Sequence, residues 1–441
     1  MRTHAGRRLL ASGAVALLVF AVPLLSACSP RVVFTVTSVL DGVDAHPGDG
    51  VCATASGACT LRAAVQEANR SALPVTINLP QATSCCGLSL LLSIPGADED
   101  GSATGDLDVT GNITIVGQVP TPNINGTFIV GTGLDRIFDV QSGGSLTLDR
   151  VGVSGGAALT GGGIRVRSGG SAQVNDSWIN SNEATESLVC GNDNVCGPVT
   201  GGGGIMNSGT LTVNRSQIAG NRSGITAGGC NFPFPVGSPA VPVSRSISGE
   251  SFCVTAVGGG ISSDGKLAVV NSSIIGNQAG PGGVFSGAGG GIFTRQGTPS
   301  TTLAFTTIVD NIAGSGQAVA GSFSMSASIL GGIPNGDACA TFYPGLGGST
   351  ITSLDYNIVS DEFCYLRQPH DHQSVDPQLV RLFQAGYDTR IPVAGSLALD
   401  AIPAGTPKLC DGTLPVDLRG THRPSGSGCD IGAVERQPTD P

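Results

Sequence analysis

The 441-residue chain has little positive charge, few charged residues of either sign and few aromatic residues. Only two residues are lysine, Lys266 and Lys408, and the formal net charge is −10. Nucleic-acid phosphates are bound through clustered Lys and Arg, so this composition argues against a nucleic-acid partner. Charged residues make up 12% of the chain whereas 68 residues are glycine. This balance favours a regular β architecture with tight turns over a helical one.

The chain also lacks any pair of cysteines separated by two residues, which is the spacing typical of zinc sites. Of its thirteen cysteines, all except Cys28 form an even set that can pair as disulfides in an oxidising compartment. Sequence does not fix the pairing, and the adjacent Cys85 and Cys86 are ambiguous. Local pairs that suggest themselves are Cys52 with Cys59, Cys190 with Cys196, Cys230 with Cys253, Cys339 with Cys364, and Cys410 with Cys429.

The N-terminus reads as a secretory signal, because arginines precede an apolar run over residues 9–25 that ends in small residues. The string Leu25-Ser26-Ala27-Cys28 resembles the lipobox of bacterial lipoproteins, in which the cysteine is acylated after cleavage. We therefore expect a signal peptide over 1–27 and a lipidated N-terminus with a short tether over 28–33. An uncleaved anchor helix is the alternative. The resemblance implies an exported protein, lipid-anchored to the cell envelope at the outer membrane or cell surface.

Four segments in the middle of the chain repeat one pattern. Each begins with Gly-Gly-Gly-Ile, continues through a polar turn and an alternating strand, and ends in Ser/Thr-x-Ile/Val and an asparagine. The segments are 161–184, 202–223, 258–279 and 289–313. An antiparallel sandwich would not repeat whole motifs, and the leucine-rich repeat signature is absent from these segments. The repeat therefore predicts stacked coils.

Aligning the repeats gives files of equivalent residues. The apolar file is Ile179, Ile218, Ile275 and Val309. A polar file is Asn182, Asn221, Asn277 and Asn311, and a second one is Asn175, Asn214 and Asn271. Stacked coils lie about 4.8 Å apart, so inward apolar residues form a continuous core and asparagines hydrogen-bond as ladders. The prediction is an all-β protein built as a single right-handed parallel β-helix, a solenoid over 81–360.

Two insertions interrupt the repeats, at 185–200 and 224–257, and each contains one of the suggested cysteine pairs. Loops of this length without secondary structure are usually functional or disordered, and a disulfide would restrict them. They are candidates for a recognition surface that binds a protein partner. Simple decoration of the stack is the alternative.

A short amphipathic helix is predicted at 59–69, with Leu61, Ala64, Val65 and Ala68 on one face. An end coil exposes its core and an open β edge, so a capping helix that plugs it is physically required. The string Cys-Thr-Leu-Arg-Ala-Ala at 59–64 resembles the bacterial CSLREA-type domain, found at the N-terminus of exported β-helix proteins. The match covers 34–80, although Ala63 replaces the consensus Glu and Thr60 the consensus Ser.

The C-terminal residues 361–441 resemble the choice-of-anchor Q-type module of surface β-helix proteins. The similar strings run over 415–424 and 429–435. Their charged residues predict a structural ion-pair network that ties the segment to the stack. Its members are Arg419, Arg423, Asp417, Asp430 and Glu435. Both resemblances imply architecture and display rather than chemistry.

Right-handed β-helices of the pectate-lyase-like superfold include pectate lyases and polygalacturonases, so catalysis is the rival hypothesis. Hydrolysis of a glycosidic bond requires carboxylates gathered on one face. The acids of the four repeats are Asp176, Glu183, Asp264 and Asp310, and the alignment places them in different columns, Asp176 beside Arg215, Ser272 and Thr306. The leading hypothesis is a monomer that acts by contact, in adhesion, polysaccharide binding or envelope scaffolding. The alternative is a polysaccharide lyase or glycoside hydrolase.

Two polar clusters are candidate metal sites. The first is rich in the oxygen ligands that Ca²⁺ prefers, and a solvated turn is the alternative interpretation. It consists of Asp98, Glu99, Asp100, Asp106 and Asp108. The second, His370-Asp371-His372 with Asp376, could ligate a transition metal. Apart from a possible Ca²⁺ ion, no cofactor is expected. The expected partners are the membrane, through the lipid, and a polysaccharide or a surface protein.

Overall fold

A computed structural model describes most of the chain beyond residue 29, where residues 31–441 form one compact unit. The described ranges are 30–82, 87–97, 99–118, 126–185, 201–224, 243–244, 252–253, 256–280, 287–295, 301–332, 337–340, 350–384 and 387–441. The predicted signal peptide, Cys28 and Asp98 lie outside them. So does the predicted pairing of Cys190 with Cys196 and of Cys230 with Cys253.

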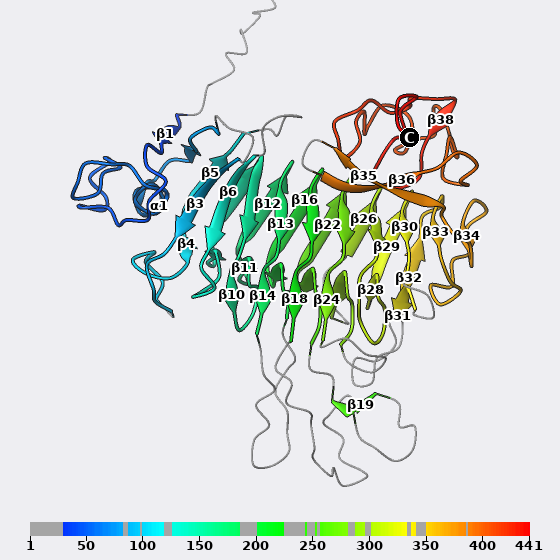
Figure 1. Ribbon diagram of the computed structural model, residues 1–441, viewed down its shortest axis with the longest axis horizontal. Coiled ribbons are helices and arrows are strands. Elements are labelled where there is room, and N and C mark those ends of the chain that lie inside the picture. The colour runs from blue at the N-terminus through cyan, green and yellow to red at the C-terminus, as the bar shows by residue number, and fades with distance from the viewer. Residues whose placement is uncertain are drawn as a thin grey trace, which may run out of the picture. The chain divides into compact units, whose positions relative to one another are not determined.

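Four parallel sheets build the unit, and we number them 1 to 4 (Figure 1). Sheet 1 contains β1 (Val32–Thr35), β2 (Val75–Asn78), β5 (Asn112–Val116), β8 (Ser145–Asp149), β12 (Ser171–Asn175), β16 (Thr210–Asn214), β22 (Lys266–Val270), β26 (Thr301–Ala304), β29 (Phe323–Ser326) and β32 (Ile351–Ser353). Sheet 2 contains β4 (Leu107–Val109), β7 (Phe138–Val140), β11 (Ile164–Val166), β15 (Ile205–Asn207), β21 (Ile261–Ser263), β25 (Ile292–Thr294), β28 (Val319–Ala320) and β31 (Cys339–Ala340).

Sheet 3 contains β3 (Leu88–Leu92), β6 (Thr127–Gly131), β9 (Val151–Ser154), β13 (Trp178–Asn180), β17 (Gln217–Ala219), β23 (Ser273–Ile275), β27 (Thr307–Val309), β30 (Ile329–Leu330), β33 (Ile358–Val359) and β34 (His372–Gln373). Sheet 4 is shorter and contains β10 (Ala157–Ala158), β14 (Glu183–Ala184), β18 (Arg222–Ser223) and β24 (Gln278–Ala279).

The chain passes through these sheets in a fixed order. From β8 in sheet 1 it continues to β9 in sheet 3, β10 in sheet 4 and β11 in sheet 2, and then returns to sheet 1 at β12. Each strand pairs in parallel with its equivalent in the next coil, as Ala172 does with Leu211 and Leu211 with Leu267. The predicted single parallel β-helix is therefore confirmed.

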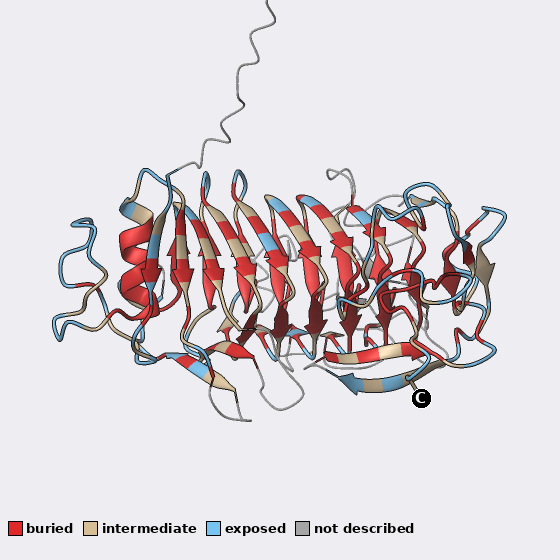
Figure 2. Ribbon diagram, turned by 90° about the horizontal axis from the view of Figure 1, so that it is seen from above, coloured by how far each residue is buried: buried red, intermediate tan, exposed pale blue. Residues whose placement is uncertain are grey.

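The core lies between the sheets, and buried residues alternate with less buried ones along the long strands of sheet 1 (Figure 2). In β8 both Leu146 and Leu148 are fully buried, while the residues between and beside them are half-buried. The period of two that defines a strand thus sorts apolar from polar side chains in each coil.

The asparagine ladder forms at the corner between sheets 3 and 4. The Nδ2 atom of Asn182 donates to Oδ1 of Asn221 at 3.0 Å, Asn221 to Asn277 at 2.9 Å, and Asn277 to Asn311 at 3.0 Å. All four side chains are buried. Each amide also meets the main chain, as Asn221 Nδ2 does by donating to the carbonyl of Ile179. A neutral amide can donate and accept at once, so it satisfies the buried polar groups of a corner without adding charge.

The second predicted asparagine file is only partly correct, because Asn175 pairs with Asn214 but the file does not continue to Asn271. Asn214 pairs with Val270, and Asn271 lies one position later, at a corner with a φ of 46°. A file of hydroxyl groups occurs at the corner between sheets 1 and 3 instead. The main-chain N–H of Ser177 donates to Ser216 Oγ at 3.0 Å, and that of Ser216 to Ser272 Oγ at 3.1 Å.

The predicted apolar file contains a one-residue error. Ile218 pairs with Ile274, and Ile274 with Ile308, so these residues face the core with Ile179. Ile275 and Val309 point outward and pack in a second apolar cluster beneath the C-terminal segment. A slip of one residue moves a side chain to the other face of a sheet. Both faces of β23 and β27 are buried, so hydrophobicity alone does not distinguish them.

The predicted capping helix is α1 (Leu61–Arg70), and its apolar residues belong to the core cluster at the first coils. Thr60 is its N-cap and accepts a hydrogen bond from the N–H of Ala63 at 3.1 Å, as capping threonines do. A disulfide joins Cys52 and Cys59 just before it. No helix in the described part of the chain is long and apolar enough to cross a bilayer.

The C-terminal segment covers the outer face of sheet 3. Its hairpin of β35 (Leu379–Gln384) and β36 (Tyr387–Pro392) runs across the stacked strands (Figure 1). There Tyr387 packs on Trp178 with 5.0 Å between ring centroids.

Two further antiparallel pairs are β19 (Val243–Ser244) with β20 (Phe252–Cys253), and β37 (Ile402–Pro403) with β38 (Gly428–Cys429).

The charged residues of this segment form the expected structural network. Arg423 is buried, contacts Glu435 at 2.9 Å, and lies 4.4 Å from the ring centroid of Phe305 on the stack. Arg419 contacts Asp440 at 2.8 Å. Disulfides join Cys339 to Cys364 and Cys410 to Cys429, which are two further pairs suggested by the sequence.

The ladder predicts a sharp effect of one substitution. Asn221→Ala removes bonds to both neighbouring asparagines and leaves buried polar groups unpaired, so we expect a loss of about 2–4 kcal/mol in the free energy of unfolding. Urea unfolding measures it. Asn180→Ala is the matched control, because Asn180 Oδ1 has no hydrogen-bond partner in the described residues. Equal losses in the two variants would contradict the role of the ladder.

Candidate functional site

The candidate site lies on the outer face of sheet 2, in the coils of β4, β7 and β11, the last of which belongs to the first of the four repeats. The parallel register places Asp108 of β4 beside Asp139 of β7, and Asp139 beside Arg165 of β11. The connection between β3 and β4 folds over these strands. Together they line an open pocket of about 430 Å³ formed by Glu99, Asp100, Asp106, Arg136, Asp139, Arg165 and Arg167.

Asp139 is the centre of the pocket and is almost fully buried. Its Oδ1 accepts from Nε of Arg165 at 3.0 Å, and its Oδ2 accepts from Nη2 of Arg167 at 2.6 Å and from Nη2 of Arg165. Burial alone would raise the pKa of Asp139, but the hydrogen bonds and charges of the arginines outweigh it and hold the pKa below its usual range. Asp139 is therefore a carboxylate that orients two arginine side chains.

Asp106 has the opposite character. It is buried and its Oδ2 lies 3.0 Å from Nη1 of Arg136, which lowers its pKa. Burial is the largest influence, however, and with the neighbouring carboxylates of Asp108, Asp135 and Asp139 it raises the pKa to about 8. The pKa of Asp108 rises to about 6, again chiefly because of burial. The pocket thus holds protonated and ionised carboxyl groups side by side near neutral pH.

One donor joins three of the acids. Gln141 Nε2 lies 3.0 Å from Asp100 Oδ1, 2.8 Å from Asp108 Oδ1 and 3.2 Å from Asp139 Oδ2. One oxygen of each acid lies within 4.8 Å of the others, which is close enough for all three to contact one metal ion. Arg167 Nη2 also bridges Asp100 and Asp139, at 2.9 and 2.6 Å. The group could hold a divalent cation, although a guanidinium already supplies positive charge there.

The sequence-predicted Ca²⁺ set is only partly brought together. Asp100 and Asp108 belong to the three-acid group, whereas Asp106 pairs with Arg136. Both oxygens of Glu99 accept main-chain N–H groups of its own turn, from Gly101 and Thr104 at 2.9 Å each. Asp98 lies outside the described residues.

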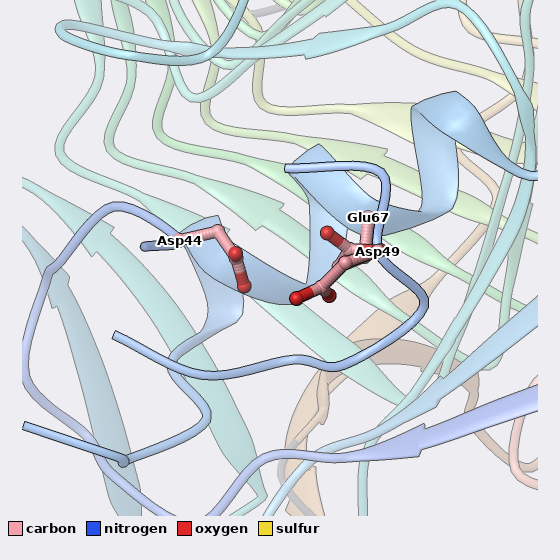
Figure 3. A group of neighbouring side chains, drawn as sticks. All are labelled: Asp44, Asp49 and Glu67. Atoms are coloured by element: carbon pink, nitrogen blue, oxygen red, sulfur yellow. The ribbon is translucent and has the colours of Figure 1, made fainter. Parts of the chain in front are cut away.

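A second acidic group lies beside the capping helix (Figure 3), formed by Asp44, Asp49 and Glu67. Asp44 accepts N–H groups from His46 and Ala53 at 2.8 and 2.9 Å. Both oxygens of Glu67 likewise accept main-chain N–H groups of the loop over 48–50. These carboxylates hold the loop of the N-terminal cap in shape.

The predicted transition-metal cluster at 370–376 is engaged in other contacts. His370 Nδ1 lies 2.7 Å from Asp355 Oδ2, and its ring stacks on Tyr356 at 4.5 Å. Asp371 accepts from the main chain and Nδ2 of Asn357, at the corner of sheets 1 and 3 that also carries the file of hydroxyl groups. Among the described residues, neither group that could surround one metal ion includes this cluster.

The sequence alignment covered only the four repeats, whereas the stacked acids Asp108 and Asp139 lie in the coils before them. Asp176 is a corner residue that pairs with Arg215 at 2.6 Å, and Asn271 rather than Ser272 occupies the equivalent corner of the next coil. The sequence reasoning missed Asp139, Arg165 and Arg167. Aligning Leu-Asp-Val at 107–109 with Phe-Asp-Val at 138–140 and Ile-Arg-Val at 164–166 would have found the column.

Comparison with known proteins adds little to this description. Neither a protein-family model nor a curated protein matches the chain. A crystal structure of pectate lyase Pel9A is similar over 93% of this chain and 97% of its own, at 13% sequence identity and a TM-score of 0.43. The assignment as a parallel β-helix rests on the strand pairing itself. The CSLREA-type and choice-of-anchor Q-type resemblances stay predictions.

The raised pKa of Asp106 predicts how stability depends on pH. Between about pH 4 and about pH 8 the folded protein keeps a proton that the unfolded chain has lost, so the free energy of unfolding falls as pH rises. Asp106→Asn removes this proton uptake and should make the fall shallower, while Asp108 and Asp430, with pKa values of about 6 and about 7, keep part of it.

Urea unfolding across this pH range measures the slope. Asp376→Asn is the control, because Asp376 is an exposed acid that does not line the pocket. An Asp106→Asn variant with the slope of the parent protein would contradict a protonated Asp106.

Proposed function

We propose that the protein binds a polysaccharide by contact, and that the pocket around Asp139 is its binding site. The observation that carries the proposal is a pocket whose described lining residues all have charged side chains, and in which one buried carboxylate orients two arginines. Such a lining favours a hydroxyl-rich or charged ligand over an apolar one.

The hydrogen-bonding capacity of the pocket matches a sugar chain. Sugar hydroxyls both donate and accept, and the pocket offers carboxyl acceptors beside guanidinium donors. Arg136 contributes a buried Nε that has no hydrogen-bond partner in the described residues. The side chains of Arg165 and Arg167 stay 28% and 37% exposed, so their remaining donors are accessible to a ligand.

Glycoside hydrolysis is the second candidate function, and one observation favours it. Asp106 has a pKa of about 8 while that of Asp139 is lowered, and both carboxyls approach Nη1 of Arg136, at 3.0 and 3.7 Å. Hydrolysis of a glycosidic bond uses one protonated carboxyl group and one carboxylate. A lyase that uses Ca²⁺ would instead need the three-acid group as its metal site.

The binding proposal is tested on a panel of soluble polysaccharides. Arg167→Ala should weaken binding about tenfold or more, equivalent to about 1.4 kcal/mol, because it removes charged donors at the pocket. Arg215→Ala is the matched control, since Arg215 forms a similar half-exposed pair with Asp176 at a different corner of the stack.

Product analysis on the same panel, with and without a Ca²⁺ chelator, separates the two functions. Binding without chain cleavage supports the contact proposal. Sustained cleavage that Asp106→Asn or Asp139→Asn abolishes would replace it with the enzymatic alternative. Equal binding by the Arg167 and Arg215 variants would place the ligand elsewhere.

We further propose that the protein is exported and held at the cell envelope as a monomer by a lipid on Cys28, with the CSLREA-type cap and the choice-of-anchor Q-type segment closing the β-helix. The signal-like N-terminus and the lipobox-like string support this proposal. Acyl chains contribute about 0.8 kcal/mol per buried CH₂, so several chains on one cysteine would give lasting attachment.

Substitution of the cysteine tests the anchor. Cys28→Ser should abolish incorporation of radiolabelled fatty acid and move the protein from the membrane fraction to the soluble fraction. Cys190→Ser is the control cysteine variant and should keep the label. Retention of label by the Cys28 variant would refute lipidation at that position.

A further inference from the structure

The capping helix α1 has a polar row in addition to its apolar face. Arg62, Gln66 and Asn69 follow one another at intervals of four and three residues, so they share one side of the helix. A plug for the end coil needs only the apolar face. The polar row therefore calls for its own explanation.

All three side chains of the row bind the main chain of the segment that carries the pocket acids. Arg62 donates to the carbonyls of Ser102, Gly105 and Asp106 at 3.1, 2.7 and 3.1 Å. Gln66 Nε2 donates to the carbonyl of Ser102 at 3.1 Å.

Asn69 binds the main chain at the C-terminal end of the segment, at and just after Asp108. Its Nδ2 donates to the carbonyl of Asp108 at 2.7 Å, and its Oδ1 accepts the N–H groups of Thr110 and Gly111 at 2.8 and 3.1 Å. The carbonyls of Asp106 and Asp108 are thus both fixed by α1.

The start of the same connection is fixed through Asp41. This residue pairs with Arg62 at 2.7 Å, and its Oδ2 accepts the N–H groups of Ser93 and Ile94 at 2.8 and 3.0 Å. One buried ion pair therefore ties both ends of the segment between β3 and β4 to the cap. Asp139 is held separately, by β7 within the stack.

We propose that Arg62, Gln66 and Asn69 are positioning residues of the pocket, through which the N-terminal cap sets where Asp106 and Asp108 stand relative to Asp139. The inference rests on the proposed function, because it assigns the polar row to that same site. It makes the cap part of the binding site as well as an end plug.

Asn69→Ala is the variant of choice, because Asn69 is half-buried in the last turn of α1, whereas Arg62 is a buried cation whose loss endangers folding. Arg70→Ala is the control, because Arg70 is adjacent to Asn69 in the chain and its side chain is exposed. Hydrogen exchange on the full chain should become about tenfold faster over 102–111 in Asn69→Ala, because three hydrogen bonds are lost. Exchange over 145–149 should not change, and the control should match the parent protein.

A second measurement separates positioning from simple loss of stability. Freeing the segment exposes Asp106, so Asn69→Ala should reduce the fall in unfolding free energy between about pH 4 and about pH 8, and should have no such effect in an Asp106→Asn, Asp108→Asn background. An Asn69→Ala variant with an unchanged pH slope, or with faster exchange throughout the chain, would reduce the row to a structural role and overturn the proposal.

Neither measurement needs a ligand, so failure of the polysaccharide panel would overturn the proposed function without deciding this inference.

Discussion

Parallel pairing in register is the constraint on which the whole structure depends. Each residue of a coil lies about 4.8 Å from its equivalent in the next coil, so equivalent positions contact one another along the stack and share one environment. Inward columns must be apolar, and corner columns must satisfy buried main-chain groups, which the asparagine and serine files do. An outward column can contain any residue type only while water covers it. Where the segment between β3 and β4 covers Asp108 and Asp139, arginines have to compensate the stacked acids.

The same constraint explains the electrostatics of the pocket. Three arginines do not neutralise every acid equally, because they converge on Asp139. Asp139 therefore stays ionised, while Asp106, with one arginine and several carboxylate neighbours, holds its proton. Burial raises the pKa of both acids, and only at Asp139 do the arginines outweigh it. This difference is why the pocket suits both recognition of a sugar chain and acid-base chemistry on one.

The sequence was sufficient to predict what repeats. Glycine runs and the asparagine file revealed the stacked coils, and the amphipathic pattern at 59–69 revealed the cap. It was insufficient where one coil is covered from outside. Ile275 and Val309 are apolar because the C-terminal segment packs on them, so the sequence pattern could not distinguish them from residues of the inner core. The pocket was missed because its partners are distant in sequence, as Asp100 and Arg167 are, and because only the last of its three coils has the Gly-Gly-Gly-Ile start. The register of β4, β7 and β11 brings these residues together.

The asparagine ladder has a direction. From Asn182 to Asn277, each side-chain amide donates to the asparagine of the following coil, and Asn311 ends the ladder by donating to main-chain carbonyls. The four side-chain dipoles therefore point the same way and polarise one another, as those of a hydrogen-bonded chain do. A coil that placed an apolar residue at this corner would interrupt the alignment and leave a donor of the preceding coil without its acceptor. The ladder thus makes one residue type at one position a condition for adding a coil to the stack.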